Sequence, residues 1–378
     1  MKVLIISTDR KLFEKDSAVL SRFKKYAAKM EELHVIVFTL RREMHADAEI
    51  GNLHVYPTNS LSRWLYVKDA KKLGKRIISK NRFEKGNSVI STQDAFQTAH
   101  AGAYLAQASS FPLQVQIHTD FLSPYFSGFL NSIRRFIASK VLPKARGIRV
   151  VSNAVKESIL KKYKNLPARI DVLPVFVDIE KIIAAEPSRD IRHDFPDWKF
   201  IIFMASRLSK EKRFDTALEA LRKIVDLYPH AGLVIAGAGP EKGNIEKKAI
   251  QLKLQKNIAL IGWKNDLVSY MKTCNVFLLT SEYEGYGMTL IEAAASGAMI
   301  VTTEVGIAKG GMFIDEVNCH VCPVGDYGCI TNRIVDVIRD NQKRELFAQR
   351  IQEAVKGKYL TEEEYSAEYV GLLEKLLQ

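Results

Sequence analysis

The stretch SEYEGYGMTLIEAAASGAMIVTT, residues 281–303, decides the fold class of this chain. An apolar run ends just before it at Thr280, and a loop containing Gly285 and Gly287 leads into a helix predicted to begin near Met288. A second short run rich in Val and Thr ends the stretch. This order of strand, glycine loop, helix and strand is typical of a parallel sheet. The N-terminus of such a helix offers free N–H groups to an anion.

The same alternation of apolar runs and amphipathic stretches extends over the whole chain and predicts an α/β fold. In the first half, strands are expected at residues 2–7, 34–40, 53–57, 88–91, 113–118 and 148–152. In the second half, they are expected at residues 200–206, 233–237, 258–262, 276–280 and 299–303. Irregular, Pro-containing sequence at residues 174–198 predicts the linker. Two Rossmann-like domains that face each other across a cleft are therefore expected.

Length and tail sequence predict how these domains are composed. A chain of 378 residues suits two domains of roughly 150 to 200 residues each, and we place them at residues 1–176 and 177–360. The tail, residues 361–378, opens with a Thr361/Glu364 capping box and is predicted to form a helix. Its apolar face consists of Tyr365, Tyr369, Leu372, Leu373 and Leu376. This face must be covered by the second domain or by a return to the first.

Composition indicates the cellular compartment of the protein and the roles that its cysteines can have. The start MKVLIISTDRK is charged too early for a secretory signal, and no apolar run approaches the ~20 residues of a membrane span. We therefore expect a cytoplasmic protein. The four cysteines are few for a disulfide framework. Cys319 and Cys322 form a CxxC pair close to Cys329 and His320, so we weighed a metal or redox site against buried residues on a strand, and favour the latter.

Net charge favours an anionic partner. Lys and Arg total 56 against 43 acidic residues, a formal net charge of +13. Zinc-finger spacing and an RNP-type aromatic stretch are both missing, so we expect no nucleic-acid binding. Two segments, residues 64–80 and 131–147, mix cations with aromatic or aliphatic side chains. They suit either docking on an anionic membrane surface or ordinary solvated helix faces.

Two glutamates mark the densest candidate site. Glu284 precedes the glycine loop, and Glu292 lies just over one turn into the helix that follows. Small apolar residues surround Glu292, so its carboxylate needs a partner. A pair of vicinal ribose hydroxyls would supply one. The alternative is a capping residue and a solvated helix residue.

A second cluster follows the strand at residues 200–206. The sequence FMASRLSKEKRFD presents Arg207 and Lys212 at the carboxyl end of that strand. These cations can compensate the charge of a diphosphate directly, and the chain has no Asp-x-Asp pair to hold a divalent metal. The stretch LVIAGAGPEKG, residues 233–243, shows only that its backbone closely approaches a ligand or a neighbouring strand.

The first half offers candidates in the stretch QVQIHTDFLSPYF. His118 lies at a predicted strand end, and Asp120 and Tyr125 follow in a loop. Asp9 follows the first predicted strand. If the two lobes close on a shared ligand, these residues are candidates for contact with it from the first lobe.

These motifs resemble glycosyltransferase family 4, which is a retaining family with the two-domain GT-B fold. Its Gly-x-Arg-Leu-x-x-x-Lys stretch, Gly-x-Gly-Pro turn and Glu-x7-Glu motif are similar to residues 205–212, 237–240 and 284–292. The resemblance implies a nucleotide-sugar donor, UDP- or GDP-linked, and a glycan or lipid-linked acceptor, with no cofactor and no metal. It also implies that the tail helix crosses back to the first domain.

Carried over residue by residue, the resemblance implies a role for each candidate. Arg207 and Lys212 would hold the diphosphate, Glu292 the ribose, and Glu284 with His118 the reacting sugar. The donor loop would comprise Gly285, Tyr286, Gly287, Met288, Thr289 and Leu290, and the base would contact Ile261, Gly262 and Trp263. The chain departs from the family's pattern in two places. After the first strand it reads STDRK where a Gly-Gly loop is usual, and in the linker it reads PVFVD where Pro-Asn-Gly-Val-Asp is usual.

Rival interpretations belong to other classes. A non-catalytic protein that closes on a sugar or nucleotide would need the same two lobes. An epimerase or a phosphorylase could share the GT-B architecture. A nucleic-acid binder rests on the net charge alone.

Overall fold

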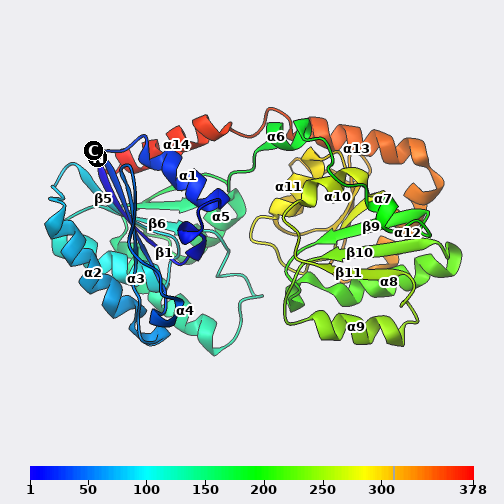
Figure 1. The fold of residues 1–378 in the computed structure, drawn as a ribbon, viewed down its shortest axis with the longest axis horizontal. Coiled ribbons are helices and arrows are strands. Elements are labelled where there is room, and N and C mark those ends of the chain that lie inside the picture. Colours follow the sequence, from blue (N-terminus) through cyan, green and yellow to red (C-terminus); the bar gives the residue numbers. More distant parts are fainter. Residues whose placement is uncertain (310) are drawn as a thin grey trace. The chain divides into compact units, whose positions relative to one another are not determined.

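The computed structural model describes residues 1–309 and 311–378, which form two compact units. Unit 1 comprises Met1–Val175 and Glu362–Gln378, and unit 2 comprises Phe176–Thr361. Each unit contains one β-sheet with helices on both faces (Figure 1). Within the described ranges, no helix is long and apolar enough to cross a bilayer.

The sheet of unit 1 has the order β3-β4-β2-β1-β5-β6-β7-β8, with only the β3–β4 pair antiparallel. The strands are β1 (Lys2–Ser7), β2 (Glu32–Val37), β3 (Ala48–Ile50), β4 (Leu53–Pro57), β5 (Ser88–Thr92), β6 (Leu113–Ile117), β7 (Gly147–Val150) and β8 (Arg169–Val172). The helices are α1 (Ala18–Ala27), α2 (Tyr66–Lys80), α3 (Gln97–Ser109), α4 (Phe129–Val141), α5 (Asn153–Lys162) and α14 (Glu362–Glu374). Short 3₁₀ turns include η1 (Arg10–Phe13) and η4 (Leu142–Lys144).

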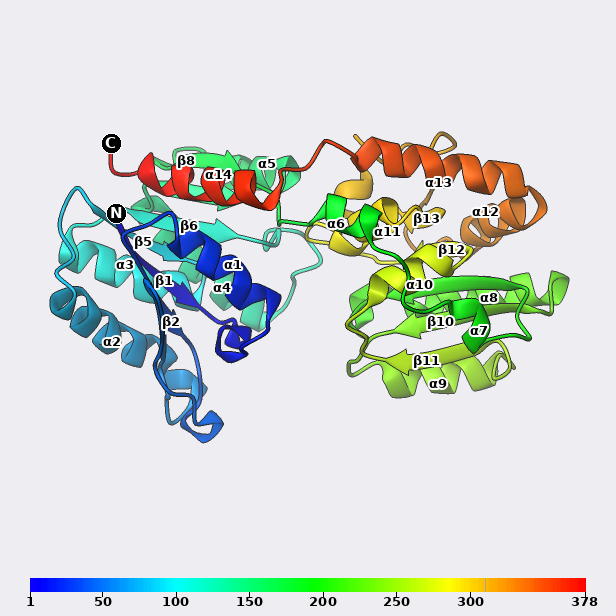
Figure 2. The ribbon, with the colours of Figure 1, turned by 45° about the horizontal axis from the view of Figure 1, so that its top comes forward.

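Helices cover this sheet on both faces. Figures 1 and 2 show α2, α3 and α4 side by side on one face and α1 beside α14 on the other. Central strands such as β1 and β5 are therefore buried on both faces, which explains why they appear in the sequence as continuous apolar runs.

The C-terminal helix α14 belongs to unit 1, so the predicted return crossing is confirmed. Tyr369 is fully buried, its ring stacks on Tyr26 at 4.3 Å between centroids, and its hydroxyl accepts a hydrogen bond from Gln116 at 3.0 Å. The buried guanidinium of Arg149 on β7 donates to the Tyr365 hydroxyl at 2.5 Å. It also donates to the carbonyls of Leu173 and Pro174 at 3.2 and 2.9 Å. One buried cation thus connects the sheet, the tail helix and the end of β8.

The sheet of unit 2 has the order β11-β10-β9-β12-β13-β14, and its neighbouring strands are parallel. The strands are β9 (Phe200–Ala205), β10 (Ala231–Ala236), β11 (Ile258–Gly262), β12 (Val276–Leu279), β13 (Ile300–Thr303) and β14 (His320–Cys322). The helices are α6 (Ile179–Ala184), α7 (Ile191–Asp194), α8 (Phe214–Leu227), α9 (Lys242–Gln251), α10 (Leu267–Thr273), α11 (Met288–Ala295), α12 (Tyr327–Arg339) and α13 (Asn341–Val355). Two 3₁₀ turns are η5 (Lys210–Lys212) and η6 (Gly306–Lys309).

The structure departs from the sequence-based expectations in two segments. The eleven expected strands form with ends shifted by a few residues at most. Strands β3 and β8 were not predicted, because they are short and only partly buried and so give no continuous apolar run. Strand β14 was expected only as the strand that carries the Cys319/Cys322 pair. The expected linker, residues 174–198, contains α6 and α7 and packs on unit 2. Ile191 is fully buried there, and its N–H donates to the Thr273 hydroxyl at 3.1 Å.

The cysteines also differ from expectation. Cys322 and Cys329 form a disulfide that joins the end of β14 to the first turn of α12. The number of cysteines argued only against a disulfide framework, but Cys322 was expected as a buried strand residue and not as part of a disulfide. The turn between β14 and α12 brings its thiol to that of Cys329, a pairing that the CxxC spacing does not indicate. Cys319 is buried with a free thiol, but it lies just before β14, whereas it had been expected within the strand.

We predict that Tyr369→Ala lowers the free energy of unfolding of unit 1 by about 3–5 kcal/mol, because it removes a large, fully buried side chain. Glu374→Ala, on the exposed side of the same helix, should change it by less than about 0.5 kcal/mol. Urea denaturation of the full chain measures both. Similar losses in the two variants would contradict the packing of α14 on this sheet.

Candidate functional site

The strand order of unit 2 predicts where a ligand would bind. From β9 the chain builds outward through β10 to β11, then returns to add β12 on the other side of β9. In parallel sheets, ligands bind beyond the carboxyl ends of the strands where the order reverses. The loops after β9 and β12 therefore flank the predicted binding crevice of unit 2.

Backbone hydrogen bonds join these two loops. The N–H of Glu282 donates to the carbonyl of Glu211 at 2.7 Å. The Thr280 hydroxyl donates to the carbonyl of Lys212 at 2.8 Å and to that of Arg213 at 3.1 Å. Residues about 70 positions apart in the chain are thereby held together at the crevice.

The joined loops place Lys212 against Glu284. The ammonium of Lys212 lies 2.7 Å from Oε1 of Glu284, and their side chains are only 12% and 11% exposed. The Ser281 hydroxyl donates to the same carboxylate oxygen at 2.7 Å. Because this pair is partly withdrawn from water, its electrostatic interaction is stronger than that of a surface pair. Ser281 was not predicted, since a serine has no distinguishing signal in a single sequence.

Arg207 has different surroundings. Its side chain is 76% exposed, and its guanidinium lies 3.4 Å from the carboxylate of Glu211. Glu211 also accepts a hydrogen bond from Ser209 at 2.6 Å. The pairing of an exposed arginine at this distance is weak, so Arg207 can reorient toward an anion.

The glycine loop and α11 complete this side of the crevice. Gly287 has a φ of +98°, a conformation that side chains disfavour, and α11 begins at the next residue. Gly287 has no side chain that could cap this helix, and the Leu290 N–H donates to the Gly287 carbonyl at 3.0 Å. The N–H groups of the first turn ahead of Leu290 are the ones that can bind an anion. Gly306 packs against the loop. A Cβ there would lie 2.7 Å from the Tyr286 carbonyl and 2.8 Å from Cβ of Glu284.

Glu292 lies one turn into α11 and is largely buried. Three fully buried alanines follow it, Ala293 to Ala295. Burial raises the pKa of the Glu292 carboxyl from its ordinary 4.5 to about 7. Among residues 1–309 and 311–378, no side chain forms a hydrogen bond or ion pair with this carboxyl. A ligand with hydroxyl donors could supply the missing partners.

The Gly-x-Gly turn after β10 is explained by a neighbouring loop. A Cβ on Gly237 would lie 1.9 Å from the Ser206 carbonyl oxygen, and one on Gly239 would lie 2.3 Å from that of Leu208. Leu208 N–H donates to the Ala238 carbonyl at 3.0 Å. Of the two alternatives left open by the sequence, close approach to a neighbouring segment accounts for both glycines.

The predicted base segment lies at the sheet edge. Gly262 ends β11 with a φ of +70°, and Ile261 precedes it within the strand. Trp263 is 62% exposed, with its indole N–H donating to Asn265 at 3.2 Å. A cavity of about 370 Å³ adjoins this segment and is lined by Ser188, Arg189, Lys264, Asn265, Asp266 and Tyr270.

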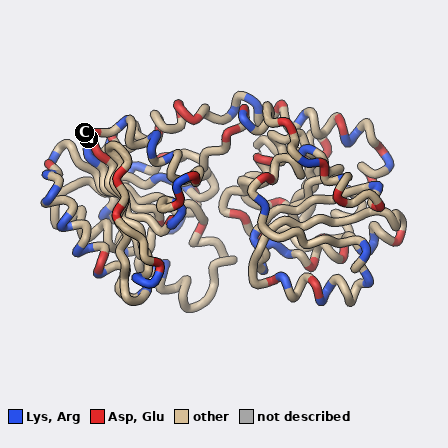
Figure 3. The backbone as a smooth tube through the Cα atoms, viewed as in Figure 1, with Lys and Arg blue, Asp and Glu red and all other residues tan. Residues whose placement is uncertain are grey.

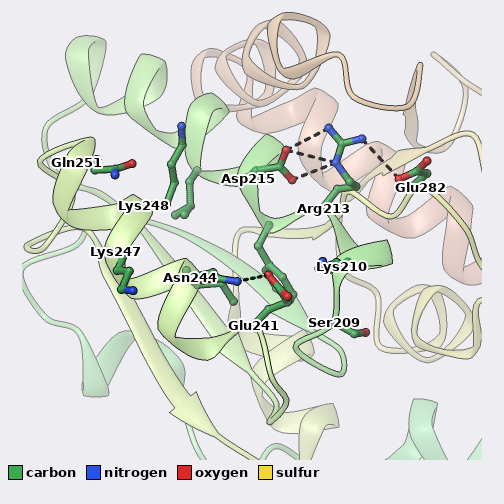
Figure 4. Close-up of a pocket in the computed structure, with 13 residues that line it drawn as sticks. Ser209, Lys210, Arg213, Asp215, Glu241, Asn244, Lys247, Lys248, Gln251 and Glu282 are labelled. Carbon is green, nitrogen blue, oxygen red and sulfur yellow. Dashed lines mark hydrogen bonds and ion pairs between the residues drawn. The ribbon is translucent and has the colours of Figure 1, made fainter.

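A larger cavity of about 620 Å³ lies between α8 and α9 (Figure 4). Arg213 lines it and is held by Asp215 at 3.0 Å and by Glu282 at 3.7 Å, while Asn244 donates to Glu241. Lys210 and Ser209 reach it from the loop after β9. None of the four predicted donor side chains, Arg207, Lys212, Glu284 and Glu292, lines this cavity.

Unit 1 carries the remaining candidates on the loops after β1 and β6. Asp9 caps η1 by accepting from the Lys11 N–H at 3.1 Å, and its own N–H donates to Ser7. His118 follows β6 and is exposed. Asp120 accepts from the Leu122 N–H at 3.0 Å and from the Ser158 hydroxyl at 2.8 Å. The Tyr125 ring packs edge-on against Phe126, with centroids 5.4 Å apart.

The strand order of unit 1 also reverses, between β1 and β5. There the Ser7 hydroxyl donates to Gln93 at 2.6 Å, which joins the loops after the two strands. Gln93 was not among the candidates, because only the adjacency of β1 and β5 places it there. His118 lies after β6, next to β5 in the sheet.

No three His, Cys, Asp or Glu side chains of the described residues are arranged to hold a metal ion. The Cys319/Cys322/His320 alternative therefore has no metal-binding geometry here.

Comparisons with known proteins divide the chain in the same way. A family model described as Glycosyltransferase Family 4 matches residues 19–181, and one described as Glycosyl transferases group 1 matches residues 188–354. The chain is 27% identical over 194 residues to an Escherichia coli UDP-Gal:alpha-D-GlcNAc-diphosphoundecaprenol alpha-1,3-galactosyltransferase, covering 50% of each chain. The chain spans about half the length of the curated relatives first matched, 49%, 50% and 54% of them.

Solved structures share the fold. HepE of Anabaena, in complex with UDP, aligns over 99% of this chain and 100% of its own, with a TM-score of 0.77 and 18% identity. Sucrose-phosphate synthase of Thermosynechococcus elongatus aligns over 100% of this chain and 99% of its own, with a TM-score of 0.81 and 17% identity. The predicted architecture of two Rossmann-like domains is confirmed.

We predict that Gly306→Ala destabilises unit 2 by about 2 kcal/mol or more beyond Gly357→Ala, measured by urea denaturation. Both glycines have positive φ, 54° and 69°, but a Cβ meets backbone only at Gly306. Equal losses would show that the loop at Glu284 does not rest on η6.

We predict that Glu292→Gln stabilises the protein in a pH-dependent way. Because the folded pKa is raised to about 7 from 4.5, wild-type stability falls as pH rises between these values, whereas the amide carries no charge. The variant should gain about 1–3 kcal/mol relative to wild type at pH 8 and almost nothing at pH 4. Urea denaturation at both pH values tests this, with the exposed Glu353→Gln as control. A pH-independent difference would contradict burial of the charge.

Proposed function

Because the chain belongs to the group 1 and family 4 glycosyltransferases, we propose that it moves a sugar from a nucleoside diphosphate sugar to a hydroxyl acceptor. The observation that carries this proposal is the Lys212–Glu284 ion pair at the crevice of unit 2, beside an uncapped helix N-terminus. Transfer proceeds with retention of configuration and without a metal ion. The donor is a UDP- or GDP-sugar, and the acceptor is a glycan or a lipid-linked intermediate.

Charge compensation of the diphosphate is assigned to Arg207 and Lys212. Lys212 is pre-positioned by its pairing with Glu284, whereas the exposed Arg207 reorients onto the bound phosphates. Free N–H groups at the start of α11 add a third positive element. Cations from protein side chains at these positions stabilise the negative charge that develops on the leaving group.

The carbohydrate parts of the donor are assigned to the two glutamates. Glu284 accepts hydrogen bonds from the transferred sugar, together with backbone of Gly285 to Leu290. Glu292 accepts hydrogen bonds from the ribose hydroxyls, which supply the partners that its buried carboxyl lacks. Ile261, Gly262 and Trp263 lie along the base.

The reaction needs only one proton transfer. The bond between C1 of the sugar and the phosphate oxygen breaks, and its electron pair stays on that oxygen. The acceptor hydroxyl attacks C1 from the face that the diphosphate leaves, which retains the configuration. Its proton passes to the leaving phosphate, so no separate protein base is required. His118, Asp9, Asp120 and Tyr125 of unit 1 are assigned to the reacting sugar and acceptor.

The acceptor class follows from a relative and from the surface of unit 1. The Escherichia coli relative is named for a diphosphoundecaprenol-linked acceptor, which supports a lipid-linked acceptor for this chain. Cation-rich helices in unit 1 fit the same environment.

Incubation with a panel of UDP-, GDP- and ADP-sugars, followed by mass spectrometry, tests the proposal. We expect slow donor hydrolysis without acceptor and transfer to a polyprenyl-diphosphate-linked sugar, with the anomeric configuration checked by NMR. Binding without turnover of any donor would favour the non-catalytic alternative. An epimerised sugar, or a sugar phosphate formed from added phosphate, would favour an epimerase or a phosphorylase instead.

We predict that Lys212→Ala lowers kcat about a hundredfold or more at saturating donor in the presence of EDTA. This decrease corresponds to a loss of on the order of 3 kcal/mol of transition-state stabilisation. Lys256→Ala, an exposed cation of the same unit, should leave kcat unchanged. Near wild-type turnover of the Lys212 variant would remove the diphosphate assignment.

A further inference from the structure

Three neighbouring helices of unit 1 have an unusual distribution of charge. We call the exposed side chains of α2, α3, α4 and η4 the α2–α4 face. These four elements carry ten Lys and Arg residues and one acidic residue, Asp69. Figure 3 shows the basic residues along α2 as a run of blue on the outside of unit 1. Ten basic residues against one acidic residue give these elements a formal charge of +9, in a chain whose formal net charge is +13.

The same face exposes large apolar side chains. Phe129, Leu130, Ile133 and Phe136 of α4 are 79%, 69%, 41% and 63% exposed. Their spacing, i, i+1, i+4 and i+7, puts them on one side of the helix. Exposed aromatic and aliphatic residues in such a stripe are rare on a free surface and mark an interaction site.

Cations border this apolar stripe. Lys140 lies one turn beyond Phe136, with its ammonium 5.6 Å from the ring centroid. Arg134 lies over the Phe96 ring at 5.7 Å. Arg135 faces inward instead, donating to the carbonyls of Phe121, Ser123 and Phe126, and so fixes the loop before α4.

Contacts across α3 make α2 and α4 parts of one surface. Helix α3 packs on both neighbours. Lys71 and Lys75 of α2 lie over the Tyr104 ring of α3, at 4.7 and 4.9 Å. Partial burial, and then the charges of Lys71 on α2 and Lys144 on η4, lower the pKa of His100 on α3. Cations from both sides therefore converge on the middle helix.

We propose that the α2–α4 face docks on an anionic lipid bilayer, with the apolar stripe of α4 entering the acyl boundary and the lysines of α2 contacting headgroups. Binding at a membrane interface depends on burial of apolar side chains and on attraction between cations and anionic lipids. The α4 stripe supplies the apolar side chains, and the Lys and Arg residues around it, with only one acidic residue among them, supply the charge. A nucleic acid would use the cations but leave the four apolar side chains in water.

Docking would serve the proposed function by bringing the loop that carries His118, Asp120 and Tyr125 near a lipid-linked acceptor, because this loop leads directly into α4. Only the role that we give to docking rests on the proposed function; the docking itself does not. Vesicle binding is measured without donor or acceptor, so failure of docking and failure of sugar transfer are distinguishable.

Flotation of the full chain with phosphatidylcholine vesicles, with and without an equal share of phosphatidylglycerol, tests the proposal at 50 and 500 mM NaCl. We expect binding to the anionic vesicles that weakens at high salt, and little binding to neutral ones. Equal binding to both vesicle types, or none to anionic vesicles at low salt, would overturn the proposal.

Variants separate the two contributions. Phe129→Ser/Phe136→Ser should lower the partition coefficient at least about tenfold. Lys68→Gln/Lys72→Gln/Arg76→Gln should lower it about a hundredfold at low salt. Leu227→Ser/Ile250→Ser, at 58% and 59% exposed positions of unit 2, should change nothing. Donor hydrolysis and circular dichroism should match wild type in all three.

The variants also exclude other partners. Wild-type vesicle binding by the phenylalanine variant, or an equal loss in the unit 2 variant, would overturn the assignment to this face. A salt-dependent gel shift with DNA or RNA that equals the vesicle affinity would assign the face to nucleic acid instead. Concentration-dependent dimers without lipid, abolished by the phenylalanine variant, would assign it to a second copy of the chain.

Discussion

The arrangement of the candidate site depends on the adjacency of β9 and β12. Because the chain returns to β9 after building β10 and β11, two loops that are distant in sequence meet at one edge of the sheet. Hydrogen bonds between Glu282 and Glu211, and between Thr280 and Lys212, then hold the loops together. The Lys212–Glu284 pair, the start of α11 and the contact with Gly306 all follow from this connection.

Glu292 shows how the same scaffold tolerates an unfavourable group. Burial of this carboxyl, which has no charged partner among residues 1–309 and 311–378, raises its pKa to about 7. Such a residue lowers the stability of the free protein at neutral pH. In the proposed function, the ribose hydroxyls supply the hydrogen bonds that the protein does not. Glu292 then lowers the stability of the free protein and strengthens the binding of the ligand.

Unit 1 separates its structural cations from its surface cations. Arg149 is buried, and its guanidinium donates hydrogen bonds to oxygen atoms of the protein, including the Tyr365 hydroxyl of the returning tail helix. Arg135 likewise binds three carbonyls. The lysines of α2 lie on the exposed side of the helix. Net charge alone does not distinguish these classes, but their hydrogen bonds do.

The sequence by itself determined the α/β class, eleven strands, the start of α11 at Met288 and the family, because these depend on local periodicity and short contiguous motifs. It also indicated that Arg207, Lys212, Glu284 and Glu292 follow or flank strand ends. Only the tertiary structure decided that Lys212 pairs with Glu284, that Ser281 joins them, and that Cys322 pairs with Cys329 rather than Cys319. Lys212 and Glu284 meet only because β9 and β12 become neighbours in the sheet, and no local pattern indicates that adjacency. Ser281 and the two cysteines lie close to their partners in the chain, but the conformation of the turns between them decides which side chains meet.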